Sequence, residues 1–172
     1  QFCMELHDAL PADTVARCIF QPLFFAETGL DLKDEIEDVW EIKHKLRQID
    51  NWEGFPILAS NDLFDMWTRA CAHRADRILL VGRADASPNP GEEERKMQQY
   101  LAEHNDARVE LILIHPEGTT LPTGTNAWLK ERNVMHHHHV RAHNHADMQR
   151  IGRFLTGNAI GVALSGGGFK AS

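Results

Sequence analysis

The sequence contains, at residues 77–82, the run Arg77-Ile78-Leu79-Leu80-Val81-Gly82. Four consecutive apolar residues without alternation are typical of a β-strand that is covered on both faces, as the strands of parallel sheets are. We therefore predict a strand here and place it at the centre of the sheet. A second buried-type run follows at residues 109–115, Val109-Glu110-Leu111-Ile112-Leu113-Ile114-His115.

Helix signals alternate with these strand signals from residue 31 onward. This alternation predicts an α/β fold, a mainly parallel sheet flanked by helices in a Rossmann-like three-layer arrangement. Further strands are predicted at residues 15–20, 55–59 and 160–164, and an edge strand at 134–141. Helices are predicted at residues 2–10, 92–105 and 123–132, and Pro22 and Gly29 are assigned to a connection.

Three more helices are predicted from apolar faces and capping residues. A helix over residues 34–50 carries one apolar face, formed by Ile36, Val39, Trp40, Leu46 and Ile49. The next helix has the stripe Leu63, Met66, Trp67, Ala70 and Cys71, and Asn61 is its predicted cap. In the last helix, Asn144 is the cap and Gly157 the left-handed residue that ends it.

The length and composition predict one globular core, because the chain has 172 residues and 42% of them are hydrophobic. The net charge of −7 argues against nucleic acid as the main partner, because phosphate binding requires a basic surface. Cys3, Cys18 and Cys71 are odd in number and show no CxxC spacing, which favours reduced thiols and a cytoplasmic location. Membrane association is expected only through other parts of a longer protein.

Histidines gather at 136–139, but strand alternation sends His136 and His138 to one face and His137 and His139 to the other. We predict no native metal site there, because no Cys or carboxylate arrangement supports one, and we expect no cofactor. His115 ends an apolar strand, where active-site groups cluster in open α/β sheets. Its favoured interpretation is a histidine bonded to backbone. The four tryptophans are predicted to be core or interface anchors.

The chain closes with the strand signal Gly161-Val162-Ala163-Leu164, followed by Ser165-Gly166-Gly167-Gly168-Phe169-Lys170-Ala171-Ser172. Consecutive glycines let backbone N–H groups converge on an anion. The Walker pattern fails because no glycine–lysine pair occurs here, whereas Gly166, Gly168 and Ala171 meet the dinucleotide pattern G-x-G-x-x-G/A. The third interpretation is an oxyanion hole, formed by the amides of the glycines with Lys170 adding positive charge.

The segment Arg153-Phe154-Leu155-Thr156-Gly157-Asn158-Ala159-Ile160-Gly161, with the glycine loop after it, resembles the entry to the patatin-like phospholipase domain in relatives of neuropathy target esterase. The resemblance extends upstream to about residue 60. Its motifs are Phe64, Trp67 and Arg69-Ala70-Cys71, then 74–82, Leu113-Ile114-His115-Pro116, Thr125-x-x-Trp128-Leu129-x-x-Arg132 and His137-His138-His139-Val140-Arg141. The family pattern places glycine after the loop's basic residue, whereas Ala171 follows Lys170 here, so the exit of the loop departs from it.

The resemblance implies a fragment of a serine lipid hydrolase that cleaves acyl esters of a phospholipid or lysophospholipid. Gly166, Gly167, Gly168 and Lys170 would form the oxyanion hole. The Ser–Asp dyad would lie beyond Ser172, so the fragment alone should be inactive. Residues 1–158 would be an α/β domain preceding the esterase domain, and 159–172 its first strand and oxyanion loop. A cyclic-nucleotide-binding domain is expected upstream. The alternative is a non-catalytic nucleotide-binding or regulatory module.

Overall fold

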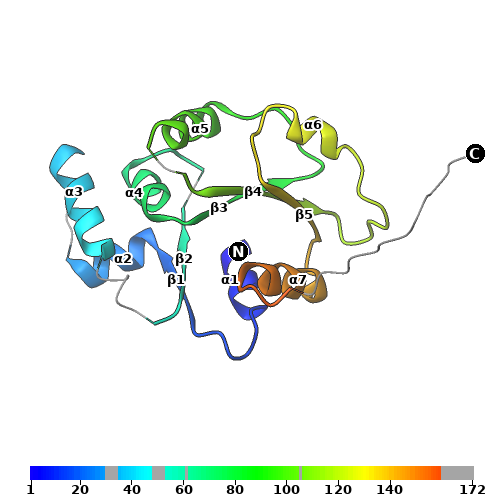
Figure 1. Cartoon of the computed structure of the whole chain (residues 1–172), viewed down its shortest axis with the longest axis horizontal. Helices are drawn as coiled ribbons and strands as arrows, with labels where there is room; N and C mark the ends of the chain where they lie inside the picture. The colour runs from blue at the N-terminus through cyan, green and yellow to red at the C-terminus, as the bar shows by residue number, and fades with distance from the viewer. Residues whose placement is uncertain (30–34, 48–52, 61, 105, 160–172) are drawn as a thin grey trace, which may run out of the picture.

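All strands that the structure describes are parallel, and they form two sheets (Figure 1). The computed structural model describes residues 1–29, 35–47, 53–60, 62–104 and 106–159. The smaller sheet pairs β1 (Ala16–Phe20) with β2 (Phe55–Ala59). The larger has the order β3-β4-β5, with β3 at Arg77–Arg83, β4 at Arg108–His115 and β5 at His136–Arg141.

Helices cover both faces of the larger sheet and make the predicted three-layer α/β fold (Figure 1). One layer contains α4 (Met66–Arg74), α5 (Glu92–His104) and α6 (Thr125–Leu129). The opposite layer contains α1 (Phe2–Asp8) and α7 (His145–Leu155). The remaining helices, α2 (Gln21–Thr28) and α3 (Glu35–Leu46), lie beside the smaller sheet.

Within the described three-stranded sheet, β4 is the central strand and β3 lies at an edge, so the described strand order does not place residues 77–82 at the centre. In β4, the residues from Glu110 to Leu113 are all buried, whereas Val81 in β3 is 44% exposed. The apolar run at 77–82 marks a strand correctly, but its place in the sheet depends on pairing with strands distant in sequence. The prediction of an edge strand at 134–141 is confirmed by β5 within the described sheet.

The start of α4 differs from the prediction. Asp65 is its cap, since the carboxylate accepts a hydrogen bond from the Thr68 backbone N–H at 2.8 Å. The assignment of this role to Asn61, which lies outside the described residues, is therefore wrong. The region around Pro22 also differs, because α2 forms there with proline in its first turn and Gly29 at its end in the left-handed conformation (φ 69°).

Two of the tryptophans named as anchors are buried and a third is not. Trp67 is 1% exposed and packs among Phe24, Ile42 and Leu46. Trp128 is 7% exposed and packs on β4. Trp40 is 68% exposed and stacks on His44, so its assignment to the apolar face of α3 is wrong. Ile42 and Leu46, four residues apart on the helix, form the described buried face instead.

One hydrophobic core lies on the face of the larger sheet that α1 and α7 cover. It contains residues of these two helices and of β4 and β5. Its buried members are Leu6, Ala9, Ile112, Val140, Met148, Ile151 and Leu155. Gly152 of α7 lies against α1, since a Cβ there would come within 2.9 Å of the Ala9 carbonyl oxygen. Among the described residues, no helix is both long and apolar enough to cross a membrane.

Candidate functional site

The three strands of the larger sheet end at one edge, because they are parallel. Arg83, His115 and Arg141 are the last residues of β3, β4 and β5. In open α/β sheets, ligands bind in the crevice outside the carboxyl ends of the strands. This edge is therefore the candidate site within the part of the chain that the structure describes.

Two histidines contact each other at this edge. His115 Nε2 lies 2.8 Å from His139 Nδ1, and the ring centroids are 5.0 Å apart. The strand register pairs Leu113 with His139, so the two histidines are diagonal neighbours on one face of the sheet. In this pair, one ring nitrogen donates and the other accepts. The predicted backbone partner of His115 is thus replaced by a side chain.

The second nitrogen of His139 faces a hydroxyl from α6. Thr125 Oγ1 lies 3.4 Å from His139 Nε2. Burial lowers the pKa of His139, and the nearby His115, His137 and Arg150 lower it further. The Arg150 guanidinium also donates a hydrogen bond to the His139 carbonyl oxygen at 2.5 Å. The His139 ring is therefore neutral at pH 7 and connects β5 to both β4 and α6.

This arrangement differs from a catalytic triad in one essential position. In a triad, a carboxylate accepts from the histidine nitrogen opposite the nucleophile and stabilises the imidazolium. Here His115, an imidazole, occupies that position beside His139 Nδ1. An imidazole lacks the negative charge with which a carboxylate stabilises an imidazolium. We conclude that the pair holds the strand ends together rather than activating Thr125 as a nucleophile.

A salt bridge fixes the turn that leads from this edge into α7. Arg141 donates to Asp147 from Nε at 2.7 Å and from Nη2 at 2.9 Å, and its backbone N–H donates at 3.0 Å. These hydrogen bonds hold the pKa of Asp147 below its usual value. Asn144 caps α7 by accepting from the Asp147 N–H at 3.0 Å, as predicted.

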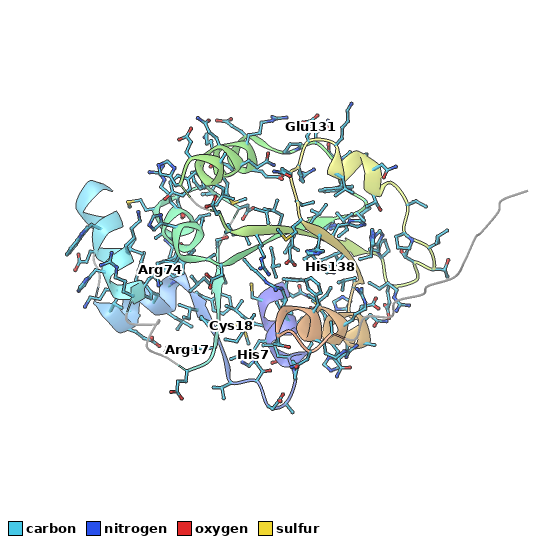
Figure 2. The ribbon with its side chains drawn as sticks, viewed as in Figure 1. His7, Arg17, Cys18, Arg74, Glu131 and His138 are labelled. Atoms are coloured by element: carbon cyan, nitrogen blue, oxygen red, sulfur yellow. The ribbon has the colours of Figure 1, made fainter. Side chains whose placement is uncertain are left out.

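A buried carboxylate lies on the opposite face of the sheet and was not singled out from the sequence. Glu110 is 1% exposed, with His138 Nε2 at 3.4 Å and Arg77 Nη1 at 3.6 Å. The Phe154 ring of α7 contacts both of these neighbours, with its centroid 4.7 Å from that of His138 and 5.3 Å from the Arg77 guanidinium. His138 is labelled in Figure 2. The only sequence signal is the charged residue within the apolar run at 109–114.

The histidine run alternates between the two faces of β5 as predicted. His136 and His138 contact Phe154, whereas His137 and His139 contact each other with ring centroids 5.5 Å apart. Within the described ranges, no group of three or more His, Cys, Asp or Glu side chains is arranged to hold a metal ion.

The predicted oxyanion residues, Gly166, Gly167, Gly168 and Lys170, lie outside the residues that the structure describes, as do the strand predicted at 160–164 and Ala171. The last helix that the structure describes is α7, and the described residues end at 159. Gly157 has a left-handed conformation (φ 78°) and follows Leu155 and Thr156, which confirms its predicted place at the end of the helix.

Comparison with known proteins identifies the family. A family model described as the neuropathy target esterase family P-loop-like domain matches residues 58–158. The chain belongs to the neuropathy target esterase family. The match confirms the resemblance seen in the sequence and covers the described elements from the end of β2 to the end of α7.

Individual relatives carry the same family name or name a patatin-like domain. The chain is similar to neuropathy target esterase sws of Drosophila grimshawi, with 32% identity over 99% of this chain and 13% of the relative. The Drosophila persimilis protein is 26% identical over 99% of this chain and 14% of its own length. A Caenorhabditis elegans protein named for a patatin-like phospholipase domain is 32% identical over 62% of this chain and 12% of its own length.

The chain therefore spans about a seventh or less of the length of these relatives. No solved structure matches it.

Several residues that carried the resemblance to neuropathy target esterase relatives pack against one another. A Cβ on Gly82 would lie 2.7 Å from the Trp128 ring, so glycine lets β3 approach α6. Arg132 is 7% exposed and its guanidinium lies 4.8 Å from the Trp128 ring centroid. It also donates to both carboxylate oxygens of Glu94, at 2.6 and 2.8 Å. These motif residues of the family thus have a structural role in joining α5, α6 and β3.

Proposed function

We propose that this chain is the region of a patatin-like lipid hydrolase that leads into its catalytic domain. Residues 1–158 form the α/β domain that precedes the esterase domain, and residues 159–172 contribute that domain's first strand and oxyanion loop. One observation carries the proposal: the family match ends at Asn158, directly before the segment that contains Gly166-Gly167-Gly168.

The proposed chemistry is acyl transfer through a serine. The amides of Gly166, Gly167 and Gly168 stabilise the oxyanion as a nucleophilic serine attacks the ester carbonyl, and Lys170 adds positive charge. The serine and its aspartate partner lie in the part of the protein that follows Ser172. The resulting acyl-enzyme is hydrolysed by water. The substrate class is a phospholipid or lysophospholipid, and residues 1–172 alone have no esterase activity.

In this proposal, the described domain holds the helix that precedes the glycine loop. Its last helix, α7, buries Met148, Ile151 and Leu155 against the sheet and is held at its start by Asn144 and Asp147. Gly157 then turns the chain away from the helix. In the proposal, α7 positions the segment that follows it. A cyclic-nucleotide-binding domain upstream would act on the esterase through this same domain.

A second candidate is a nucleotide-binding module, which the words P-loop-like in the family description favour. The sequence offers no G-x-x-x-x-G-K-[ST] pattern, only the dinucleotide spacing at Gly166, Gly168 and Ala171. Isothermal titration of the full-length protein with ATP and NAD separates the candidates. The hydrolase proposal expects no tight binding at this region, and loss of tight binding on substitution of Gly166 would favour the nucleotide module.

The oxyanion role is tested with Gly167→Pro in the full-length protein, because proline removes the amide donor. We expect kcat for a lysophospholipid ester to fall about 100 to 1,000-fold with little change in KM. Gly118→Ala is the control, since no atom lies within 4 Å of the added Cβ. Unchanged kcat in a folded Gly167→Pro protein would exclude the proposed role.

A further inference from the structure

A cavity of about 1060 Å³ lies between the two sheets. All five residues of β2 and six consecutive residues of β3, Arg77–Gly82, line it. Neighbouring residues of a strand point to opposite faces, so a cavity lined by every residue in turn runs along the strand edge and not over one face. The cavity is therefore a slot between the edges of β2 and β3.

Both strands have a free edge on this slot. Within the described residues, β2 pairs only with β1 and β3 pairs only with β4. Both helix layers also line the slot: Cys3 and Leu6 of α1 lie on one side, and Cys71 of α4 and Met97 of α5 on the other. Backbone groups buried in such a place require hydrogen-bond partners.

The dimensions of the slot suit one strand. Five residues extend about 17 Å at roughly 3.3 Å per residue. With a strand spacing of about 4.8 Å and a layer thickness of about 10 Å, a strand of that length fills roughly 800 Å³. The cavity of about 1060 Å³ can hold such a strand.

We propose that one further parallel strand fills this slot, and that the segment of the full-length protein directly before Gln1 supplies it. The result is one continuous sheet in the order β1-β2-new strand-β3-β4-β5. Because helices cover both faces of the slot, the strand is an apolar run of about five to seven residues.

The position of α1 identifies the occupant. Gln1 itself lines the slot, as do Cys3 and Leu6 of α1. The helix α1 then leads to β1 (Figure 1). The relatives match this chain over only 9 to 14% of their length, so the family's proteins contain the additional chain that the proposal requires.

The handedness of the connections agrees with this assignment. From β3 to β5 the chain moves in one direction across the sheet, and its helices α5 and α6 lie on one face. From the slot to β1 it moves in the opposite direction, and α1 lies on the opposite face (Figure 1). A connection that reverses both its direction across the sheet and the face that its helix covers keeps the same handedness. Connections between parallel strands have the same handedness in nearly all proteins, so the proposed strand agrees with this rule.

The test is photo-crosslinking in the full-length protein, with a diazirine amino acid at Val81, which lines the slot. We expect peptide mapping to place the crosslink in the peptide directly before Gln1. Met135 is the control position, because it is 59% exposed and does not line the slot. A crosslink to residues 159–165, or to a second copy of the protein, would overturn the assignment of the occupant.

A second measurement tests the proposal if no crosslink forms. In the full-length protein, the thiol of Val81→Cys should react with a maleimide at least tenfold more slowly than that of Met135→Cys. Val81 is 44% exposed in the described chain, and a strand in the slot would cover it. Equal labelling rates at the two positions would show an open slot and contradict the proposal.

Discussion

At the scale of single residues, Gly82 is one of two glycines, among those for which the structure gives the surroundings, where an added Cβ would come closer than 3.0 Å to another atom. A Cβ there would lie 2.7 and 2.9 Å from two atoms of the Trp128 ring. The ring cannot easily move, because Arg132 packs on it and is itself held by Glu94. We expect Gly82→Ala to lower the free energy of unfolding by about 1–3 kcal/mol, as overpacking does.

Urea denaturation of the purified chain measures this loss. Gly118→Ala serves as the matched control, because the added Cβ has no neighbour within 4 Å, and it should leave the midpoint unchanged. Equal stability of the two variants would show that the packing of β3 on α6 is looser than described.

The pair of histidines predicts a pH dependence of stability. The pKa of His139 is lowered in the folded chain, first by burial and then by the nearby His115, His137 and Arg150. The unfolded state therefore binds more protons than the folded state below the ordinary pKa of about 6.5. Stability should fall as the pH decreases through that value, until the folded-state pKa is reached.

Denaturation of wild type and His139→Gln at pH 7.5 and 5.5 measures this dependence. The substitution should reduce the difference in stability between the two pH values. The comparison variant is His145→Gln, the same substitution at an exposed histidine, measured at the same two pH values. An unchanged difference in His139→Gln would exclude His139 as a source of the pH dependence.

At the scale of elements, α7 carries the connection to the proposed catalytic segment. Asn144 caps it by accepting a hydrogen bond from the Asp147 N–H. Asn144→Ala should cost about 1 kcal/mol of stability, the typical loss for an N-cap. Hydrogen exchange should also become faster in the first turn of α7. Asn89→Ala, in an exposed loop, should change neither quantity, and equal effects of the two substitutions would contradict the capping role.

The sequence predicts a helix or strand well where its signal comes from residues that are close together in the chain. The bounds of β2, Phe55–Ala59, and the two ends of α7 are as predicted, because apolar runs, caps and glycines act within a few residues. The helix α2 is missed because Pro22 is taken as a break, although proline is well suited to the first turn of a helix. The face of α3 is misassigned at Trp40, since an exposed aromatic residue stacked on His44 resembles a core residue in sequence.

The candidate site depends on contacts that no local pattern encodes. His115 and His139 meet because the register of β4 and β5 makes them diagonal neighbours. The position of β4 at the centre of its sheet, and the burial of Glu110 beside His138, depend on pairing in the same way. The chemistry proposed for the glycine loop comes from sequence motifs and the family, since Gly166–Gly168 lie outside the described residues.

At the scale of the whole molecule, the described chain has an α/β fold with parallel sheets. Its core is built from α1, α7 and a parallel sheet, and the matched relatives of the neuropathy target esterase family are far longer. In our proposal, the strand before Gln1 completes the sheet and the segment after Asn158 starts the catalytic domain. The described domain would then be tied to the rest of the protein at both of its ends.

The measurement that tests the proposed function most directly is the intact mass of the full-length protein before and after reaction with a fluorophosphonate, followed by peptide mapping. We predict one stoichiometric adduct on a serine located after Ser172, in a G-x-S-x-G sequence, and no adduct on residues 1–172 expressed alone. Absence of any adduct on an active preparation, or an adduct on a serine within residues 1–172, would contradict the account.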